Sequence, residues 1–498
     1  MTVAVAAVLV CAQSAAAAPR TELLGVTPLG SEVQRFHYRY GPLYVPPGGN
    51  MNLIGPVTIE KPPYDGYAVR IKPDMVRADG SVPNVDVIHL HHGVFVNLSR
   101  DDTTNPGLPE RFFGTGEEKT IFQVPRGYGY PVRRSDVWAF NHMLHNQTPV
   151  AETVYVTYDV DFIPKDSELG RKTRPVTPVW MDVRNGEQYP VFDVRRADGG
   201  RDGRFVYPND KRPYGNGRKR NEWRVPRAGK MVATAGHVHP GGLWTDLHVV
   251  RGRRRFRAFR SKAIYYDPNG PISWDLSMEA TQSRWRVGLK KGDKLRISSA
   301  YETKRASWYE SMGINVAYVA FGSKPKPDPF NRRQRRRIRR KGLVTHGHLK
   351  ENENHGGTGA GSKDARKRPN GTTLDRRVGI TGFVYTPGDL GAAGPFGFPP
   401  TIAQGQRLRF DNADSPEQIY HTITSCKAPC DGATGISYPL ANGPVDFDSA
   451  ELGYGPEGTT AAANRSNWST PPDLKAGTYT YFCRVHPFMR GAFRVKKQ

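Results

Sequence analysis

Four side chains near the C-terminus have the types and the spacing of a metal-binding site. Cys483, His486 and Met489 follow one another at the spacing C-x2-H-x2-M, which places a thiolate, an imidazole and a thioether on one short loop. His421 opens the strand-like run His-Thr-Ile-Thr and can supply a second imidazole. Two histidines, a cysteine and a weak axial methionine are the ligands of mononuclear blue copper sites. The sequence therefore predicts a type 1 copper site at these four residues.

The ligand run also resembles a known family. From Cys483 to Gly491 it reads Cys-Arg-Val-His-Pro-Phe-Met-Arg-Gly, which resembles the ligand loop of the cupredoxins, in particular those of the amicyanin type. The resemblance covers about residues 378–497. It implies a Greek-key β-sandwich that carries one electron at a time. Such a domain exchanges electrons with a redox partner protein or a small reductant.

A second set of soft ligands precedes this segment, in three histidine motifs and one methionine position. The set consists of His89, His91, His92, His142, His145, His237, His239 and Met312. Residues i and i+2 of a strand share a face, so His237 and His239 can bind one metal. Adjacent His91 and His92 point to opposite faces unless the strand bulges, which the following Gly93 permits.

The order of these motifs, H-H, then H, then H-x-H, then M, resembles the copper type II monooxygenases, the family of peptidylglycine alpha-hydroxylating monooxygenase and dopamine beta-monooxygenase. The resemblance covers about residues 45–322 and implies two consecutive β-sandwiches with one copper on each. For the first, electron-supplying copper it implies His91 and His92, with either His145 or His142 as third ligand. For the second copper it implies His237, His239 and Met312. A His2Met set suits Cu(I) because the thioether is soft, and an open position there could take O2.

Two alternatives use the same histidines differently. One is a copper-binding electron carrier without oxygen chemistry. The other is a multicopper oxidase, whose H-x-H motifs are similar to H-L-H-H-G and H-V-H-P-G-G. That enzyme needs histidine on both sides of its cysteine, whereas Cys483 stands between Phe482 and Arg484. The monooxygenase resemblance also has a departure, because the family's first domain contains several disulfides and no cysteine occurs here between residues 12 and 425.

Length and composition predict the domain organisation. A chain of 498 residues is too long for one core and suggests about three domains. Many Gly and Pro residues between short Val, Tyr, Ile and Thr runs favour an all-β fold. We expect two consecutive monooxygenase-like β-sandwiches at 45–170 and 171–322, a basic linker at 323–377 and a cupredoxin domain at 378–498.

The N-terminus and the cysteines predict an exported protein. Residues 1–18 are apolar and end in small residues, which is typical of a signal peptide. Its removal would also remove Cys11. With Cys483 committed to copper, Cys426 and Cys430 remain, and in an oxidising compartment we expect them to form a disulfide. The predicted location is secreted or extracytoplasmic, in the periplasm or the cell wall.

The net charge of +25 is partly concentrated in one segment. Residues 324–341 contain ten Lys or Arg and one Asp, enough to bind an anionic polymer. Export argues against nucleic acid, so a cell-wall polyanion or an anionic lipid surface is the predicted partner, and a solvated spacer is the alternative. His346, His348 and His355 follow in the same linker, where they form either a copper-loading site or a solvated loop.

Overall fold

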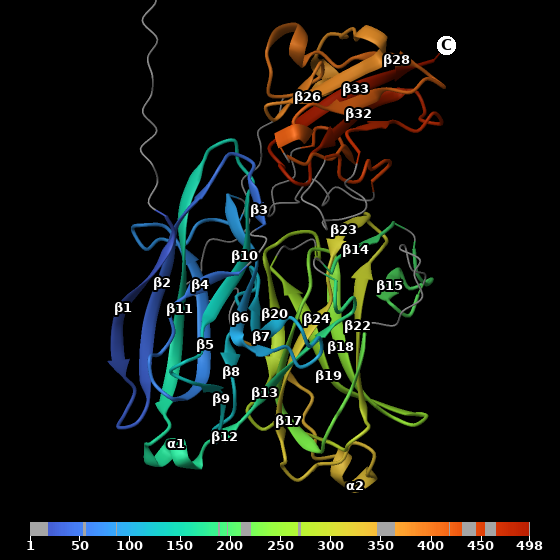
Figure 1. Ribbon diagram of the computed structural model, residues 1–498. Coiled ribbons are helices and arrows are strands. Elements are labelled where there is room, and N and C mark those ends of the chain that lie inside the picture. Colours follow the sequence, from blue (N-terminus) through green and yellow to red (C-terminus); the bar gives the residue numbers. More distant parts are fainter. Residues whose placement is uncertain are drawn as a thin grey trace, which may run out of the picture.

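The computed structural model describes residues 18–52, 56–85, 87–187, 190–196, 198–210, 221–266, 270–345, 364–417, 419–430, 445–453 and 465–497. The described chain is almost entirely β-structure, so the predicted all-β class is confirmed (Figure 1). Its two α-helices, α1 (Glu168–Lys172) and α2 (Arg332–Arg335), are single turns. No helix of the described residues is long and apolar enough to span a membrane.

The N-terminal part is a sandwich of two sheets. The strands of one sheet are, in order, β1 (Arg20–Pro28), β2 (Gln34–Val45), β11 (Glu152–Pro164), β5 (Gly66–Val76), β9 (Tyr128–Val132) and β12 (Arg174–Pro175), with β8 (Phe122–Gln123) beside β5. The other sheet has the order β3 (Asn50–Asn52), β10 (Trp138–Asn146), β6 (Ile88–Asp101) and β7 (Pro109–Thr115), with β4 (Val57–Ile59) beside β10. β1 and β2 pair with each other and β2 pairs with β11, so this sandwich begins at Arg20.

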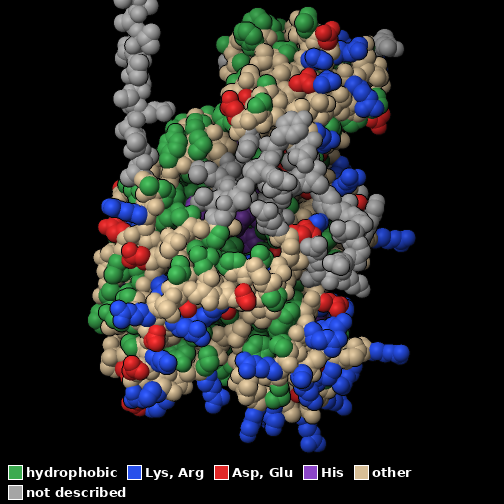
Figure 2. All heavy atoms as spheres, in the orientation of Figure 1, with side chains coloured by type: hydrophobic (Ala, Val, Ile, Leu, Met, Phe, Trp, Pro, Cys, Tyr) green, Lys and Arg blue, Asp and Glu red, His purple; other side chains and the backbone are tan. Residues whose placement is uncertain are grey.

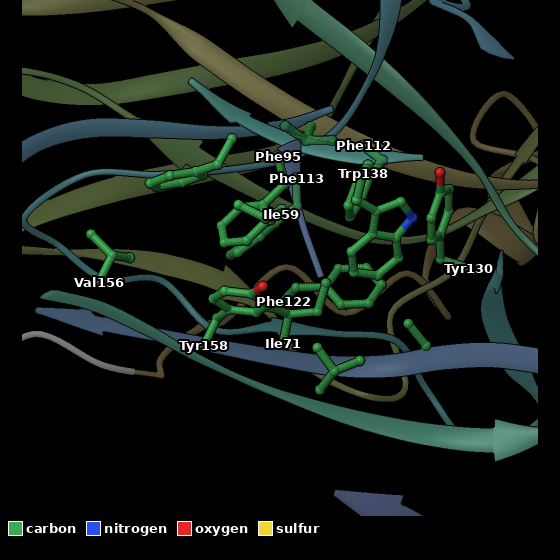
Figure 3. Close-up of a cluster of buried hydrophobic side chains, with 14 of the residues drawn as sticks. Ile59, Ile71, Phe95, Phe112, Phe113, Phe122, Tyr130, Trp138, Val156 and Tyr158 are labelled. Carbon is green, nitrogen blue, oxygen red and sulfur yellow. The ribbon is translucent and has the colours of Figure 1, made fainter. Parts of the chain in front are cut away.

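Aromatic side chains fill the space between these two sheets (Figure 3). Phe112 lies 4.6 Å, centroid to centroid, from both Tyr130 and Trp138. The same core continues into the next part of the chain, because Tyr318 contacts Phe122 at 4.6 Å and donates a hydrogen bond to the Phe112 carbonyl at 2.9 Å. The first two parts of the chain therefore share buried apolar surface, which stabilises their relative position.

The second part is built on one large sheet. Its strands are, in order, β13 (Thr177–Asp182), β24 (Ile314–Phe321), β17 (Gly229–His237), β20 (Leu276–Thr281), β19 (Arg254–Tyr265), β18 (Gly242–Arg251), β22 (Lys294–Glu302) and β15 (Arg204–Tyr207). Additional pairings involve β16 (Glu222–Arg224), β21 (Val287–Leu289) and β25 (Gly342–Val344), and β14 (Phe192–Val194) pairs with β23 (Trp308–Ser311).

The described start of the predicted linker packs against this second part. β25 pairs with β20, and Asp328 accepts hydrogen bonds from Arg251 at 3.0 and 3.1 Å. The Arg251 and Arg254 guanidinium groups lie 4.7 and 4.9 Å from the Phe330 ring. Residues 324–345 thus belong to the folded second part, while residues 346–363, with the three linker histidines, lie outside the described residues.

The C-terminal part is a separate sandwich of two four-stranded sheets. One has the order β27 (Val384–Thr386), β26 (Arg377–Thr381), β29 (Arg409–Asn412) and β31 (Asn467–Ser469). The other has the order β28 (Thr401–Ala403), β33 (Arg490–Lys496), β32 (Gly477–Phe482) and β30 (Thr424–Cys426). Four short 3-10 turns accompany them: η1 (Ala365–Lys367), η2 (Leu374–Arg376), η3 (Gly394–Gly397) and η4 (Ser415–Glu417). The predicted Cys426–Cys430 disulfide is present, with the Cα atoms 5.4 Å apart.

Candidate metal centres

The Cys483 site is formed where β32 ends. Cys483 directly follows that strand, and His486 and Met489 occupy the loop before β33. Two backbone hydrogen bonds close the loop: Met489 N–H donates to the His486 carbonyl at 2.9 Å, and Cys483 N–H donates to the Met489 carbonyl at 3.1 Å. The short loop therefore holds all three predicted ligands close to one sheet edge.

His421 brings its ring to this loop from before β30. Its Nδ1 lies 3.9 Å from Cys483 Sγ and 3.3 Å from His486 Nδ1, and His486 Nδ1 is 3.9 Å from the same sulfur. The three donor atoms lie within 4.8 Å of one another and are fully buried. Met489 is also buried and packs in the same apolar cluster as Cys483. The structure thus brings together the residue types that type 1 copper requires.

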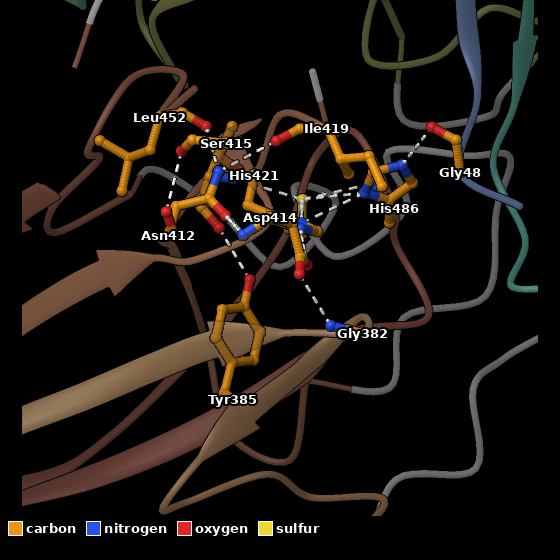
Figure 4. A network of polar contacts seen from close by, with 12 residues as sticks. Gly48, Gly382, Tyr385, Asn412, Asp414, Ser415, Ile419, His421, Leu452 and His486 are labelled. Carbon is orange, nitrogen blue, oxygen red and sulfur yellow. Dashed lines mark hydrogen bonds and ion pairs between the residues drawn. The ribbon is translucent and has the colours of Figure 1, made fainter. Parts of the chain in front are cut away.

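The surroundings favour an ionised cysteine and a fixed histidine orientation. Burial alone raises the pKa of Cys483, but contact with His421 and the N–H groups of Thr422 and His486, each 3.3 Å from Sγ, bring it below its ordinary value. His421 Nε2 bonds the Asp414 carboxylate at 3.0 Å (Figure 4). This bond leaves Nδ1 facing the sulfur, because a carboxylate that bonds one ring nitrogen fixes the role of the other.

A contact with the first sandwich covers the same site. His486 Nε2 lies 3.2 Å from the carbonyl oxygen of Gly48 (Figure 4). Gly48 has φ +59°, and a Cβ atom there would approach the Phe383 ring to 2.1 Å and His486 Nε2 to 2.9 Å. Only glycine combines this backbone conformation with such a close approach. The third domain therefore docks with His486 turned toward the first.

The second group of histidines lies on β6, β10 and the end of β17. His89 pairs with His145 across β6 and β10, whereas His92 pairs with Met143. The register shifts between these pairs and leaves His91 as the extra residue of a bulge, which the nearby Gly93 permits. Figure 2 shows histidine side chains at the bottom of a hollow between the domains.

The donor atoms fall into two groups that share one residue. His89, His91 and His145 form one group, and His91, His92 and His239 form the other, each within 4.8 Å. The Trp274 ring lies between them, 4.7, 4.4 and 4.8 Å from His89, His91 and His239. Burial, followed by the neighbouring histidines, lowers the pKa of His91 and His239 well below the ordinary value, so these rings are neutral, as metal ligands must be.

Unpaired ring nitrogens indicate that these groups fit a metal. Both nitrogens of His91 and Nε2 of His237 and His239 are buried without a hydrogen-bond partner among the described residues. Buried polar atoms are normally paired. The other nitrogen of His239, Nδ1, donates to the Glu310 carbonyl at 2.5 Å, and His237 Nδ1 bonds Glu118 Oε1 at 3.0 Å. In both rings Nε2 is therefore the nitrogen free to bind copper.

The grouping differs in detail from that expected from the motifs. The structure places His91 between the two groups, His145 with His89, and His92 with His239. His142 stacks on Phe140 at 5.2 Å and belongs to neither group. His237 and Met312 meet at a cavity rather than in a group of three. Nothing in the motifs pointed to His89 as a donor beyond its place in H-L-H-H, and no sequence signal marked Trp274 or Glu118.

Two spaces adjoin the histidines. The smaller, about 80 Å³, lies between the three domains and is lined by His91, His145, His239, Trp274 and Arg484 among others. Across this junction the His145 and His486 rings are 6.2 Å apart. The two candidate metal centres are therefore separated by a single ring contact.

The larger cavity, about 610 Å³, lies between sheets of the first and second parts of the chain. One wall is β6 and β7, with His92, Val94 and Phe113. The opposite wall is the β13–β24–β17 face, where Ile314 pairs with both Asp182 and His237. Most of the lining is apolar, and Met312, His237 and His92 supply soft donors to it. Such a cavity can hold an apolar organic molecule beside these histidines.

No family model and no curated protein matches this sequence. Two similar solved structures are a novel purple cupredoxin from Nitrosopumilus maritimus and a copper-containing nitrite reductase from Thermus scotoductus SA-01. The first is 21% identical over 24% of this chain and 98% of that chain, with a TM-score of 0.15. The second is 12% identical over 55% of this chain and 59% of that chain, with a TM-score of 0.16. At these TM-scores neither similarity adds to the evidence from the site.

Proposed function

We propose that this protein is an exported copper redox enzyme with two functional parts. The C-terminal domain is a type 1 copper electron-transfer domain with ligands His421, Cys483, His486 and Met489. The first two domains form a monooxygenase-like core with two further coppers, which oxidises an organic molecule held in the large cavity. A redox protein or a small reductant supplies the electrons, and O2 is the second substrate.

The donor sets support copper at both places. The Cys483 site combines a thiolate, two imidazoles and a buried thioether, and the core offers only imidazoles and the Met312 thioether. These soft and borderline donors suit copper better than magnesium or calcium. When bound, copper would supply one-electron transfer at the Cys483 site and oxygen activation in the core.

The contacts of the Cys483 loop with the other domains support electron transfer from the third domain to the histidine core. The Cys483 loop is buried, and Arg484 connects it to the second domain by donating a hydrogen bond to the Ser307 carbonyl. Asp448 of the third domain bonds the same guanidinium at 2.7 Å and holds it in this orientation. The His145 and His486 rings, with centroids 6.2 Å apart, connect the two histidine sets. A tethered, docked donor domain also works at high effective concentration.

The large cavity is the observation that carries the oxygenase proposal. A pure electron carrier has no use for 610 Å³ of apolar space beside His92, His237 and Met312. The small side chains Ala233, Ala235 and Ala280 keep this space open between the two sheets. The substrate is accordingly an organic molecule with a largely apolar body.

A multicopper oxidase is the second candidate, and one observation favours it. His91 belongs to both histidine groups, so metals bound there would be close neighbours rather than separate centres. Such a cluster would reduce O2 with reductant alone. A monooxygenase consumes O2 productively only when the organic substrate fills the cavity.

Oxygen uptake by the copper-loaded, ascorbate-reduced full chain tests the proposal. We expect uptake to be lost in His239→Ala and retained in His37→Ala, because His37 bonds Asp159 on the first sheet and belongs to neither group.

Ala235→Phe should fill the cavity and abolish oxidation of organic substrates while copper content stays unchanged. Uptake that is insensitive to Ala235→Phe and to every organic molecule supplied would favour the oxidase. If the chain binds one copper, and substituting His91 or His239 does not change that content, the protein is only an electron carrier.

The proposal of export rests on residues 1–18, most of which lie outside the described residues. N-terminal sequencing of the protein recovered outside the cytoplasm should begin after Ala18. A protein that retains Met1 and stays in the cytoplasm would contradict it.

A further inference from the structure

A buried loop of the first domain reaches the histidines of the second. The loop runs from Gly116 to Thr120, and its side chains Glu117, Glu118 and Lys119 are 8%, 2% and 0% exposed. Three charged residues in a row are rarely buried without a specific purpose. Lys119 pairs with Asp74 at 2.9 Å and with Glu117 at 3.6 Å. Because Lys119 is paired with these two carboxylates, the buried Glu118 carboxylate needs a different partner.

That partner is His237. Glu118 Oε1 lies 3.0 Å from His237 Nδ1, across the boundary between the first two domains. In the neutral ring the carboxylate accepts a hydrogen bond from Nδ1–H, so Nε2 is the nitrogen with a free lone pair, and His237 lines the large cavity. A carboxylate on the far nitrogen fixes the ring and raises its basicity as a metal ligand.

The loop backbone is shaped for this contact. Lys119 has φ +43°, which side-chain-bearing residues seldom adopt, and its N–H donates to the Gly116 carbonyl at 2.9 Å. A Cβ atom at Gly116 would come within 2.5 Å of Glu118 Oε2 and 2.8 Å of His237 Cε1. Strain of this kind persists only where the surroundings hold it in place.

The neighbouring Glu117 carboxylate bonds the backbone of the strand that carries His89 and His91. Glu117 Oε2 accepts a hydrogen bond at 3.0 Å from the N–H of Leu90, the residue between His89 and His91. This bond lies at the bulge that turns His91 away from the strand's regular alternation. One loop thus bonds His237 directly, through the Glu118 side chain, and also bonds the backbone between His89 and His91, through the Glu117 side chain.

We propose that Glu118 is a positioning residue for His237, through which the first domain sets the copper affinity of a ligand on the second. The proposal rests on the proposed copper core, since it needs His237 to bind copper. It makes the metal site depend on the contact between the two domains, and not on the second domain alone.

The experiment measures Cu(I) affinity in the full chain carrying Cys483→Ser, so that the blue site does not compete. Bicinchoninate serves as the competing chelator. We expect Glu118→Ala to weaken Cu(I) binding by about 10- to 100-fold. Glu118→Gln, which keeps the hydrogen bond but not the charge, should have an intermediate effect. The Cu(II) electron paramagnetic resonance spectrum should change in both variants, which a purely structural role would not produce in folded protein.

Glu110→Gln is the matched control. Glu110 is another buried glutamate of the first domain, but it accepts a hydrogen bond from Tyr130 at 2.6 Å instead of a histidine. We expect wild-type affinity in this variant. If Glu118→Ala fails to fold, Glu118→Gln and Glu118→Asp still carry the comparison. Wild-type affinity and spectrum in all folded Glu118 variants would overturn the inference and leave the copper core standing. Failure of the parent chain to bind copper at all would instead overturn the proposed function, and the inference with it.

Discussion

At the scale of single residues, the donor atoms determine what each site can bind. Cys483 is the one free cysteine in the described part of the chain, and it is buried beside His421 and His486. The N–H groups that point at its sulfur stabilise the thiolate form, and the Asp414–His421 bond orients the imidazole. Such prepared sites reduce the reorganisation needed on binding.

The first prediction concerns this sulfur. Cys483→Ser should abolish the intense blue colour of the Cu(II)-loaded protein, because that colour arises from charge transfer between thiolate and copper. Visible absorption spectroscopy measures it. Copper bound by the histidines of the first two domains should remain, as metal analysis of the same sample would show. An intensely blue Cys483→Ser protein would rule out the assignment.

The residues of the Cys483 site could be predicted from sequence because three of them lie on one short loop. The histidine groups were harder. The order of the motifs predicted His91, His92, His237 and His239 as copper ligands, but it could not show that a bulge at His91 turns this residue toward both groups. His89 and Trp274 complete the cluster through contacts between distant strands. Such contacts leave no local pattern in the sequence.

At the scale of elements, the segment ahead of β26 is also part of the third domain. Arg368, ahead of β26, donates hydrogen bonds to four backbone carbonyls of the β27–β28 connection, at 2.6–3.1 Å. Ala365 is fully buried against Leu390 and Ala492. The domain therefore includes the described residues from Asp364 on, a stretch whose linker-like composition had suggested a start at residue 378.

The second prediction follows from this boundary. A fragment of residues 364–498 should fold alone and turn blue with Cu(II), whereas a fragment of residues 378–498 should be markedly less stable. Each hydrogen bond lost with Arg368 is worth about 1 kcal/mol, or more where it leaves a carbonyl buried and unpaired. Urea unfolding of the two fragments measures the difference. Equal midpoints would show that residues 364–377 add nothing to the domain.

The third prediction concerns the contact between Gly48 and His486. Gly48→Ala should push the third domain away from the first, because its Cβ would overlap Phe383 and crowd His486. We expect slower electron transfer from the blue site to the core, measured by stopped-flow loss or recovery of the blue colour. Gly30→Ala is the control, since Gly30 also has a positive φ (+105°) but no atom lies within 4 Å of the position that a Cβ would take there. Equal rates in both variants would contradict the docked geometry.

At the scale of the whole molecule, a cluster of positive charge lies away from the candidate metal centres. The third domain occupies one end and α2 marks the other (Figure 1), with the histidine hollow between them (Figure 2). Figure 2 shows Lys and Arg side chains gathered at the end around α2. These exposed residues come from the predicted basic segment and from two adjoining turns: Arg332, Arg333, Arg335, Arg336, Arg337, Arg339, Arg340, Lys341, Arg253, Arg254, Arg255, Lys290 and Lys291.

This arrangement sharpens the prediction about the basic segment. The composition of residues 324–341 predicts a cluster of cations within a linker, whereas the structure places them on a folded surface. Contacts of Arg251 and Arg254 with Phe330 hold the segment against the β18–β19 turn, so its charges add to those of the turns and form one fixed basic face. A fixed face concentrates the local positive potential more than a solvated spacer does.

The last prediction is that this face binds an anionic surface of the cell envelope and leaves the metal centres free for their partners. Replacing the eight exposed Arg and Lys residues between Arg332 and Lys341 by Gln should strongly reduce binding to vesicles containing anionic lipid, or to purified wall polyanion, as measured by co-sedimentation. Wild-type binding should fall steeply with added salt, because exposed charges are screened over about 8 Å at physiological ionic strength. Replacing only the arginines by Lys keeps the charge and should preserve the binding. Copper content should be the same in all three proteins, since none of the replaced residues belongs to the candidate metal centres. Binding that survives both the Gln substitutions and high salt would mean that the segment is a spacer and that contact with the envelope, if it occurs, uses another face.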